Sequence, residues 1–272
     1  MKINLHNRNI KTIVITVLML LVLHSLVSSI SLKAFINITA LEIIFGGLFL
    51  SIIVSFSFET LLNTFYTIKS SFYEEINYSD YIYHLHKVSI QVKKDGPLSI
   101  SNFIEKEEDI FLKDAMILLN DYKKTSAIKD ILEKDIDSRL TNLYTPYNVL
   151  KMVSHIAPAF GLTGTLLGLI GLLSHINETN MIMYNMASAL VSTLYGSLIA
   201  NFIAVPLMGK IKNHIDRTIL KYHIIKEGIL LISENDSPRN VFDTMNVMLK
   251  ENDRLAYPIA KRSENIDEFF KS

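Results

Sequence analysis

Four stretches of the sequence contain no Asp, Glu, Lys or Arg and are rich in Leu, Ile, Val, Phe and Ala. They cover residues 12–32, 43–58, 152–177 and 179–209. A helix needs about 20 mostly apolar residues to cross the roughly 30 Å of bilayer hydrocarbon. The first, third and fourth stretches reach this length, and the second reaches it if its helix begins near Ala40. The sequence therefore predicts four transmembrane helices.

The overall composition excludes several other classes of protein. The 272 residues include 27 Lys and Arg, 27 Asp and Glu, and no Cys. A net charge of zero argues against a nucleic-acid-binding protein, which usually carries a basic excess. Without Cys, the chain forms no disulfide scaffold and no thiolate zinc site. A cleaved signal peptide is the alternative for residues 12–32, but this run is longer than the usual apolar core of a signal.

The basic residues predict how the chain crosses the membrane. If the N-terminus is cytoplasmic, the external loops are residues 33–41 and 175–181, and Lys33 is the only basic residue in them. Basic residues collect in cytoplasmic loops, so we expect both termini inside. The expected fold is an all-α integral membrane protein with a helical cytoplasmic domain between transmembrane helices 2 and 3. The expected divisions are 1–58 (transmembrane helices 1 and 2), 59–151 (cytoplasmic helical domain), 152–209 (transmembrane helices 3 and 4) and 210–272 (cytoplasmic C-terminal helices and tail).

The charged segments also show helical patterns. Apolar residues recur at helical spacing within residues 126–143 and 110–119. The same spacing continues through residues 210–233, so we expect the fourth transmembrane helix to extend past the membrane. Ser237 followed by Pro238 is a typical N-cap and first residue of a further helix.

The third and fourth apolar stretches carry small residues at helical spacing. Lipid provides no hydrophobic force between helices, so small residues that let two backbones approach closely drive their association. This pattern predicts a tightly packed helix pair, and structural packing alone is one explanation of it. The packing candidates are Gly161, Gly164, Gly168, Gly196 and Ala200.

Hydroxyl groups accompany these small residues at membrane depth. A single membrane Thr or Ser usually bonds a carbonyl of its own helix, but a cluster could line a polar path. Ion relays generally need an ionisable group within the membrane, and residues 152–177 and 179–209 contain no carboxylate. A conducting complex would therefore take that group from a partner. The hydroxyl candidates are Thr165, Ser192, Thr193 and Ser197.

Two long motifs are similar to those of a known family. APAFGLTGTLLGLIGLL (157–173) and MASALVSTLYGSLIANFIAVPLMGKI (186–211) resemble the MotA/TolQ/ExbB family of ion-driven membrane motors. TolQ and ExbB have three spans, whereas four are predicted here. The double glycine at 46–47 and the segments 131–137 and 227–249 also resemble the flagellar stator branch, MotA.

The resemblance implies a function and partners. Five copies would surround two copies of a MotB-like, single-span, peptidoglycan-binding partner in the lipid of the bacterial inner membrane. The partner would supply the ion-carrying Asp, and flux of H+ or Na+ would generate torque on the flagellar rotor, with no cofactor. Pro158 and Pro206 match the family's two functional prolines, and Thr165 and Thr193 match positions facing the ion path. Thr165 favours Na+, although most family members use H+.

The rotor contact departs from the family pattern. Its basic residue matches Lys93 or Lys94, which precede the glycine of an expected turn at residues 93–97, but Ser101 occupies the place of the acid. Glu105 and Glu108 lie nearby and are the candidate substitutes.

Other functions have weaker support. An ExbB/TolQ-like energy-transducing channel and a non-conducting membrane scaffold are the alternatives. An enzyme is not expected: His84 and His86 lack a third metal ligand in register and are expected at the surface. The acidic cluster 105–109 is expected to be a solvated face or a partner surface, and the chain has no phosphate-binding glycine loop.

Overall fold

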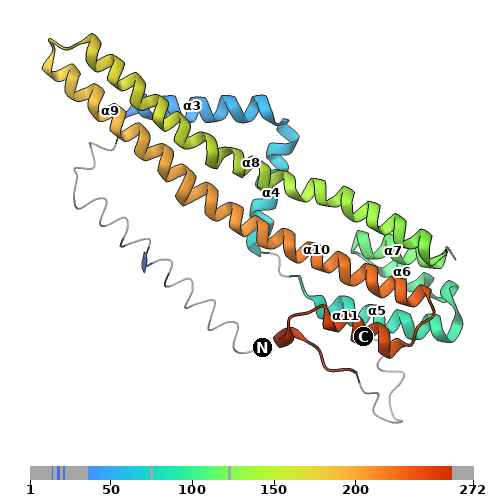
Figure 1. The fold of residues 1–272 in the computed structure, drawn as a ribbon. Coiled ribbons are helices and arrows are strands. Elements are labelled where there is room, and N and C mark those ends of the chain that lie inside the picture. The colour runs from blue at the N-terminus through green and yellow to red at the C-terminus, as the bar shows by residue number, and fades with distance from the viewer. Residues whose placement is uncertain are drawn as a thin grey trace. The chain divides into compact units, whose positions relative to one another are not determined.

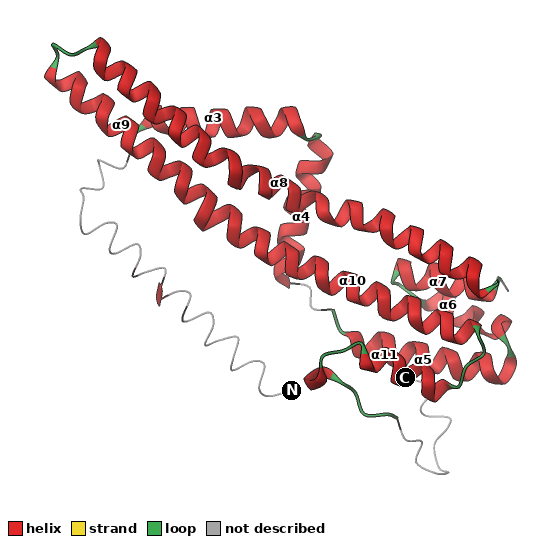
Figure 2. Ribbon diagram, in the orientation of Figure 1, coloured by secondary structure: helices red, strands yellow, loops and turns green. Residues whose placement is uncertain are grey.

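The computed structural model describes residues 36–258 except 74, 75, 122 and 123, together with Val14, Val17, Leu18 and Leu21. The first predicted transmembrane helix, residues 12–32, otherwise lies outside the described residues. The described part of the chain is helical and contains no strand (Figure 2). Three of its helices are long and apolar enough to cross a membrane.

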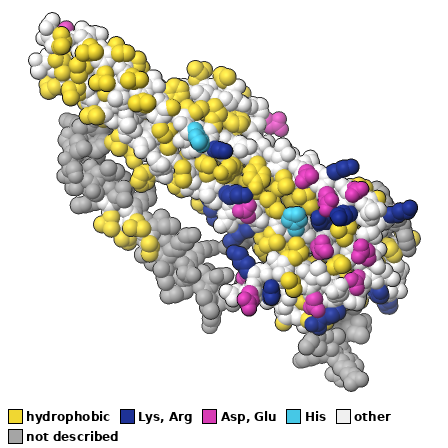
Figure 3. Space-filling view, viewed as in Figure 1, with side chains coloured by type: hydrophobic (Ala, Val, Ile, Leu, Met, Phe, Trp, Pro, Cys, Tyr) yellow, Lys and Arg dark blue, Asp and Glu magenta, His cyan; other side chains and the backbone are white. Residues whose placement is uncertain are grey.

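The chain divides into two compact units. One comprises residues 1–61 and 148–208, and the other comprises residues 62–147 and 209–272. Most charged side chains visible in Figure 3 gather over the second unit, whereas the visible surface of the first is largely apolar. This segregation of charge is the one that the apolar stretches predict.

Helix α3 (Ile38–Ser55) is the second predicted span. The side chain of Asn37 accepts a hydrogen bond from the Ala40 amide and caps its first turn. The helix ends at Ser55 rather than at residue 58, because Phe56 is extended and the Ser57 hydroxyl accepts a hydrogen bond from the Thr60 amide. That serine bond starts a separate helix, α4 (Phe58–Tyr73).

The third and fourth spans are parts of longer helices. The predicted helix at 126–143 and the predicted span at 152–177 form one 50-residue helix, α8 (Thr125–Ser174). Helix α9 (Thr179–Leu198) continues through a π-helical segment (Ile199–Ala204) into α10 (Val205–Ser233). The predicted extension past residue 209 is therefore confirmed.

The second unit packs short helices on parts of α8 and α10. They are α5 (Tyr78–Asp95), the 3-10 turn Pro97–Ile100, α6 (Ser101–Lys106), α7 (Ile110–Asn120) and α11 (Pro238–Val247), and Figure 1 shows α5 beside α11. Their core buries large apolar side chains, including Ile82, Phe111, Ile128, Ile225 and Phe242. As predicted, Ser237 caps α11 by accepting a hydrogen bond from the Asn240 amide, with Pro238 at the first helical position.

The turn expected at residues 93–97 is shorter than predicted. Lys93 and Lys94 complete the last turn of α5, and the chain reverses only at Gly96. Gly96 has φ 81° and ψ 169°, a conformation that is essentially restricted to glycine. Its amide donates to the Val92 carbonyl, and its carbonyl accepts from the Ser99 amide, so this geometry joins α5 to the following turn.

We predict that Gly96→Ala lowers the free energy of unfolding by about 1 to 3 kcal/mol, because a β-carbon strains this backbone conformation. The control is Gly209→Ala in α10, where a β-carbon meets nothing within 4 Å. Alanine is favoured over glycine in a helix by about 0.5–1 kcal/mol, so this variant should be at least as stable as wild type. Thermal unfolding of the purified protein checks both, and equal melting temperatures would contradict the prediction.

Candidate functional site

The predicted glycines of α8 lie directly against α9. A β-carbon on Gly164 would lie 2.5 Å from the Ser192 β-carbon, and one on Gly168 would lie 2.7 Å from that of Ala189. A β-carbon on Gly161 would meet the backbone of Ser192 at 3.0 Å. The contacts at Gly164 and Gly168 are closer than normal packing permits and the one at Gly161 is unusually tight, so the two helices approach at a distance that favours glycine.

The small residues of α9 and of the π-helical segment after it complete this interface. A β-carbon on Gly196 would overlap the Ala157 carbonyl oxygen. Ala200 packs in a buried cluster with Ala157 and with Ile44 and Leu48 of α3. Helix α3 also approaches α8 closely, since a β-carbon on Gly47 would overlap the ring of Phe160. Three helices of the first unit therefore pack around small residues.

Thr165 and Thr193 form a hydroxyl pair across the α8–α9 interface. Their hydroxyls bond one another, and each also lies within hydrogen-bond distance of the Gly161 carbonyl, at 3.2 and 3.3 Å respectively. Each hydroxyl has one proton, so it donates to only one of these acceptors at a time. Thr165 lies 3.2 Å from the Ala189 carbonyl of α9 as well. The bond from Thr163 is different, because its hydroxyl donates only along its own helix, to the Ala159 carbonyl. The structure thus separates a cross-helix pair from an ordinary membrane threonine.

A polar row runs along the exposed side of α9 and into the π-helical segment that follows it. Thr193, Ser197 and Asn201 are four residues apart and all exposed in this chain. The Asn201 amide donates to the Ser197 carbonyl at 3.0 Å and to the Ser197 hydroxyl at 3.2 Å. Ser192 lies away from this row, fully buried, and donates to the Ser188 carbonyl at 2.8 Å.

The two prolines lie at different kinds of position. Pro158 is exposed within α8, which continues through it without interruption. Pro206 is exposed near the start of α10, directly after the π-helical segment Ile199–Ala204. π-Helical turns are rare in proteins, and those that occur are often found at functional sites. No sequence pattern predicts the π-helical segment. The nearby Pro206 has no amide hydrogen to donate to the helical hydrogen-bond series.

The rotor-contact candidates lie in the last turn of α5 and in or just after α6. Lys93 is exposed, yet its ammonium group donates to the Asn235 carbonyl at 2.6 Å. Lys94, Glu105 and Glu108 are exposed. Ser101, which stands in the place of the family acid, donates to the Leu98 carbonyl.

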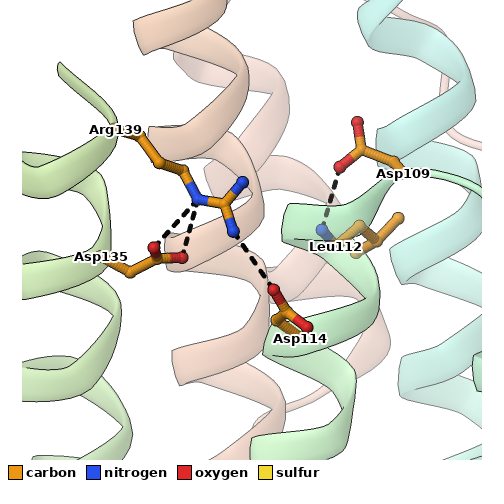
Figure 4. Close-up of polar contacts among 5 residues, drawn as sticks. All are labelled: Asp109, Leu112, Asp114, Asp135 and Arg139. Atoms are coloured by element: carbon orange, nitrogen blue, oxygen red, sulfur yellow. Dashed lines mark hydrogen bonds and ion pairs between the residues drawn. The ribbon is translucent and has the colours of Figure 1, made fainter. Parts of the chain in front are cut away.

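The acidic cluster 105–109 is only partly a solvated face, because Asp109 points inward. Its carboxylate accepts hydrogen bonds from Lys221 at 2.7 Å and from the Tyr81 hydroxyl at 2.9 Å. It also accepts one from the Leu112 amide at 3.0 Å, which Figure 4 shows. Burial alone would raise the pKa of Asp109, but these hydrogen bonds and the charge of Lys221 outweigh burial and hold it below its usual value. Burial and the neighbouring Asp109 charge raise the pKa of Tyr81. A cavity of about 590 Å³ adjoins this group.

Arg139 of α8 forms a second, partly buried group of polar contacts in this unit. Its guanidinium bonds both oxygens of Asp135 on its own helix, at 2.9 and 3.0 Å, and Asp114 of α7 at 3.2 Å (Figure 4). It also lies 5.4 Å from the ring centre of Phe111. The alternating charges of the predicted helix thus serve a contact between α7 and α8 in addition to facing solvent.

The two histidines are not both surface residues, as the sequence interpretation expected. His86 is only 3% exposed, and His84 is partly buried with its Nδ1 atom 3.4 Å from Glu107. The helix α5 that carries them packs this face on the core, which the spacing of two histidines alone does not reveal. Among the described residues, no group of three or more His, Cys, Asp or Glu side chains could hold a metal ion.

Comparison with known proteins identifies the family. A model of the MotA/TolQ/ExbB proton channel family matches residues 104–224. Motility protein A of Aquifex aeolicus (strain VF5) is 30% identical over 233 residues, which cover 85% of this chain and 92% of that protein. The chain belongs to the MotA/TolQ/ExbB proton channel family. Another similar protein, the uncharacterized protein YtxD of Bacillus subtilis (strain 168), is 30% identical over 77% of each chain.

Two solved structures have the same fold as this chain. The C. jejuni MotAB structure matches with a TM-score of 0.78 and 19% identity, covering 88% of this chain and 94% of that chain. The flagellar MotAB stator complex from Bacillus subtilis matches with a TM-score of 0.77 and 21% identity, covering 88% and 95%.

We predict that Gly164→Ala destabilises this family member by about 1 to 3 kcal/mol, the usual cost of overpacking a tight contact. Gly46→Ala is the control, because a β-carbon there meets nothing within 4 Å. Ser192→Gly removes the atoms that the new methyl group would meet, so the double variant should be more stable than the sum of the single changes indicates. Thermal unfolding of all four variants tests this, and simple additivity would contradict the packing contact.

We predict that Lys221→Met lowers the free energy of unfolding at neutral pH by about 3 kcal/mol, since it leaves a largely buried carboxylate unpaired. The pKa of Asp109 is lowered in the folded wild-type protein, so its stabilising effect is present above its ordinary pKa and is lost as pH falls through the folded value. The difference between variant and wild type should therefore shrink in acid. Lys226→Met is the control, because its partner Glu133 is exposed. Equal losses for the two variants across pH would refute the role of Asp109.

Proposed function

We propose that this chain is the MotA-type stator subunit of an ion-driven rotary motor that turns the bacterial flagellum. The observation that carries this proposal is the 30% identity with a motility protein A over nearly the full length of both proteins. Motility protein A of Borreliella burgdorferi is also 33% identical over 171 residues. Both solved complexes that share the fold pair a MotA with a MotB.

The proposed topology has four transmembrane helices with both termini in the cytoplasm. Residues 1–58 would supply the first two helices and residues 152–209 the last two, which form the ion-channel core. Residues 59–151 and 210–272 would form the cytoplasmic part. The apolar surface of the first unit and the ion pairs of the second support this assignment, and the bacterial inner membrane is the corresponding location.

The proposed ion path follows the polar row of α9. Thr193 and Ser197 present exposed hydroxyls, and Thr165 holds Thr193 from α8. Ser192 is buried behind the row and supports it through packing. Because the row contains no carboxylate, a MotB-like single-span partner bound to peptidoglycan would supply the Asp that carries H+ or Na+. Five copies of the chain would surround two copies of this partner, as the family resemblance implies.

The proposed movement involves the two prolines. Pro206 follows a π-helical segment whose hydrogen-bond pattern differs from that of the helices on either side. A proline next to such a segment leaves fewer regular backbone hydrogen bonds to resist bending. Pro158 would have the matching role on α8, and the exposed Lys94, Glu105 and Glu108 would contact the rotor, with Lys93 beside them.

We predict that Thr193→Val reduces ion flux through the reconstituted complex by about tenfold or more, because a lost hydrogen bond to a charged species is worth roughly 1.5–3 kcal/mol. Thr163→Val is the matched control, since that hydroxyl bonds only its own helix. The assay uses vesicles that contain this chain with its partner, and replacing Na+ by K+ at constant pH identifies the ion. Equal flux in both variants would refute the pathway.

The same assay separates the alternatives. Flux through this chain alone, at the rate of the complex, would refute the requirement for a partner carboxylate. Complete absence of flux with every partner would indicate a non-conducting scaffold. Flux without any effect on swimming speed in cells would indicate an energy-transducing channel of the ExbB/TolQ kind.

A further inference from the structure

Residues 254–258 form a strap that lies along α5 and α11. Side chains of those two helices hold its backbone. The Asn246 amide group of α11 donates to the Leu255 carbonyl at 2.9 Å and accepts from the Leu255 amide at 2.7 Å. The Tyr83 hydroxyl of α5 donates to the Ala256 carbonyl at 3.2 Å. These bonds attach the strap through side chains rather than through a shared helix or sheet, so it can separate without breaking either helix.

The ring of Tyr257 anchors the end of the strap. The Phe242 ring packs edge-on against it with centroids 5.1 Å apart, and the Arg239 guanidinium lies 4.1 Å from its centre. The Tyr257 hydroxyl makes a hydrogen bond of 3.2 Å with His86 Nε2. His86 itself packs edge-on against both rings. One buried imidazole therefore connects the strap to α5 and α11.

His86 suits this contact only in its neutral form. A neutral imidazole has one N–H donor and one acceptor, whereas an imidazolium has two donors. The Nδ1 atom is buried without a hydrogen-bond partner, so a proton there would have no acceptor. Burial lowers the pKa of His86, because removal from water disfavours the charged ring.

The ionisable groups around His86 do not offset this lowering of its pKa. Tyr83 lies on the same helix, and Tyr257 is on the strap. On α11, Arg239 brings a positive charge next to Tyr257, and Asp243 is paired with that arginine at 2.6 Å. Protonation of His86 would thus place an unpaired N–H, near another cation, inside the contact with Tyr257.

We propose that residues 254–258 are a releasable strap, held while His86 is neutral and released when His86 takes up a proton. The released form binds more protons than the docked form, so docking is complete above the ordinary histidine pKa of 6.5 and weakens as pH falls below it. Release uncovers Tyr83, Asn246 and the ring of Phe242 at the edge of the core, while the other core residues of the second unit remain packed. This inference concerns the second unit alone and does not depend on the proposed motor function.

The test is hydrogen–deuterium exchange of the full chain in its membrane complex, at about pH 7.5 and about pH 5.5. Protection of the Leu255 amide, corrected for intrinsic exchange, should fall by up to about tenfold per pH unit below the ordinary pKa, the limit for one proton. Protection of amides within α11 should not change. His86→Gln, which keeps a neutral hydrogen-bonding group, should make Leu255 protection independent of pH. Asn246→Ala should remove that protection at both pH values.

His84→Gln is the matched control, because His84 lies on the same helix but faces Glu107 and Phe103 rather than the strap. It should retain the wild-type pH response. The proposal is overturned if Leu255 protection in the wild type does not vary with pH, if α11 loses protection together with it, or if His84→Gln abolishes the response. If His86→Gln does not fold, the comparison of Leu255 with α11 in the wild-type chain decides between local release and general unfolding.

Discussion

The close approach of α8 and α9 determines which polar groups of the first unit bond across the interface and which stay exposed. Where Gly161, Gly164 and Gly168 face α9, only small side chains such as those of Ser192 and Ala189 lie between the two helices, and the hydroxyl of Thr165 can reach a carbonyl of α9. Lipid does not drive apolar helices together, so this contact depends on shape. This interface determines which residues of α9 lie outside the contact with α8, and Thr193 is one of these exposed residues.

The second unit is organised differently, because its charged groups must be paired when they are buried. Asp109 is held by an ammonium, a phenol and a backbone amide at once, which together compensate for its removal from water. Arg139 similarly joins two carboxylates across α7 and α8. Removing one partner of a buried pair such as Asp109 and Lys221 is costly, because it leaves a charge uncompensated.

Helices with strong local signals could be predicted from the sequence, and contacts between distant residues could not. The cap at Ser237, the α7 helix and the extension of α10 follow from short-range patterns. The burial of His86 and the inward direction of Asp109 depend on α10 and α11, which lie more than 100 residues away along the chain. The continuity of α8 was also missed, because its change from charged to apolar residues resembles a boundary although the backbone does not break there.

In the proposed motor, the absence of a carboxylate from residues 152–177 and 179–209 would be a physical advantage. If each subunit of the proposed ring carried its own buried charge, that charge would have to be solvated again at each position, which costs several kcal/mol. Hydroxyls such as those of Thr193 and Ser197 are neutral and can rotate to donate or accept. A neutral polar surface can therefore face a charged partner in several positions with similar free energy, and the ion-carrying charge needs to exist only on the partner.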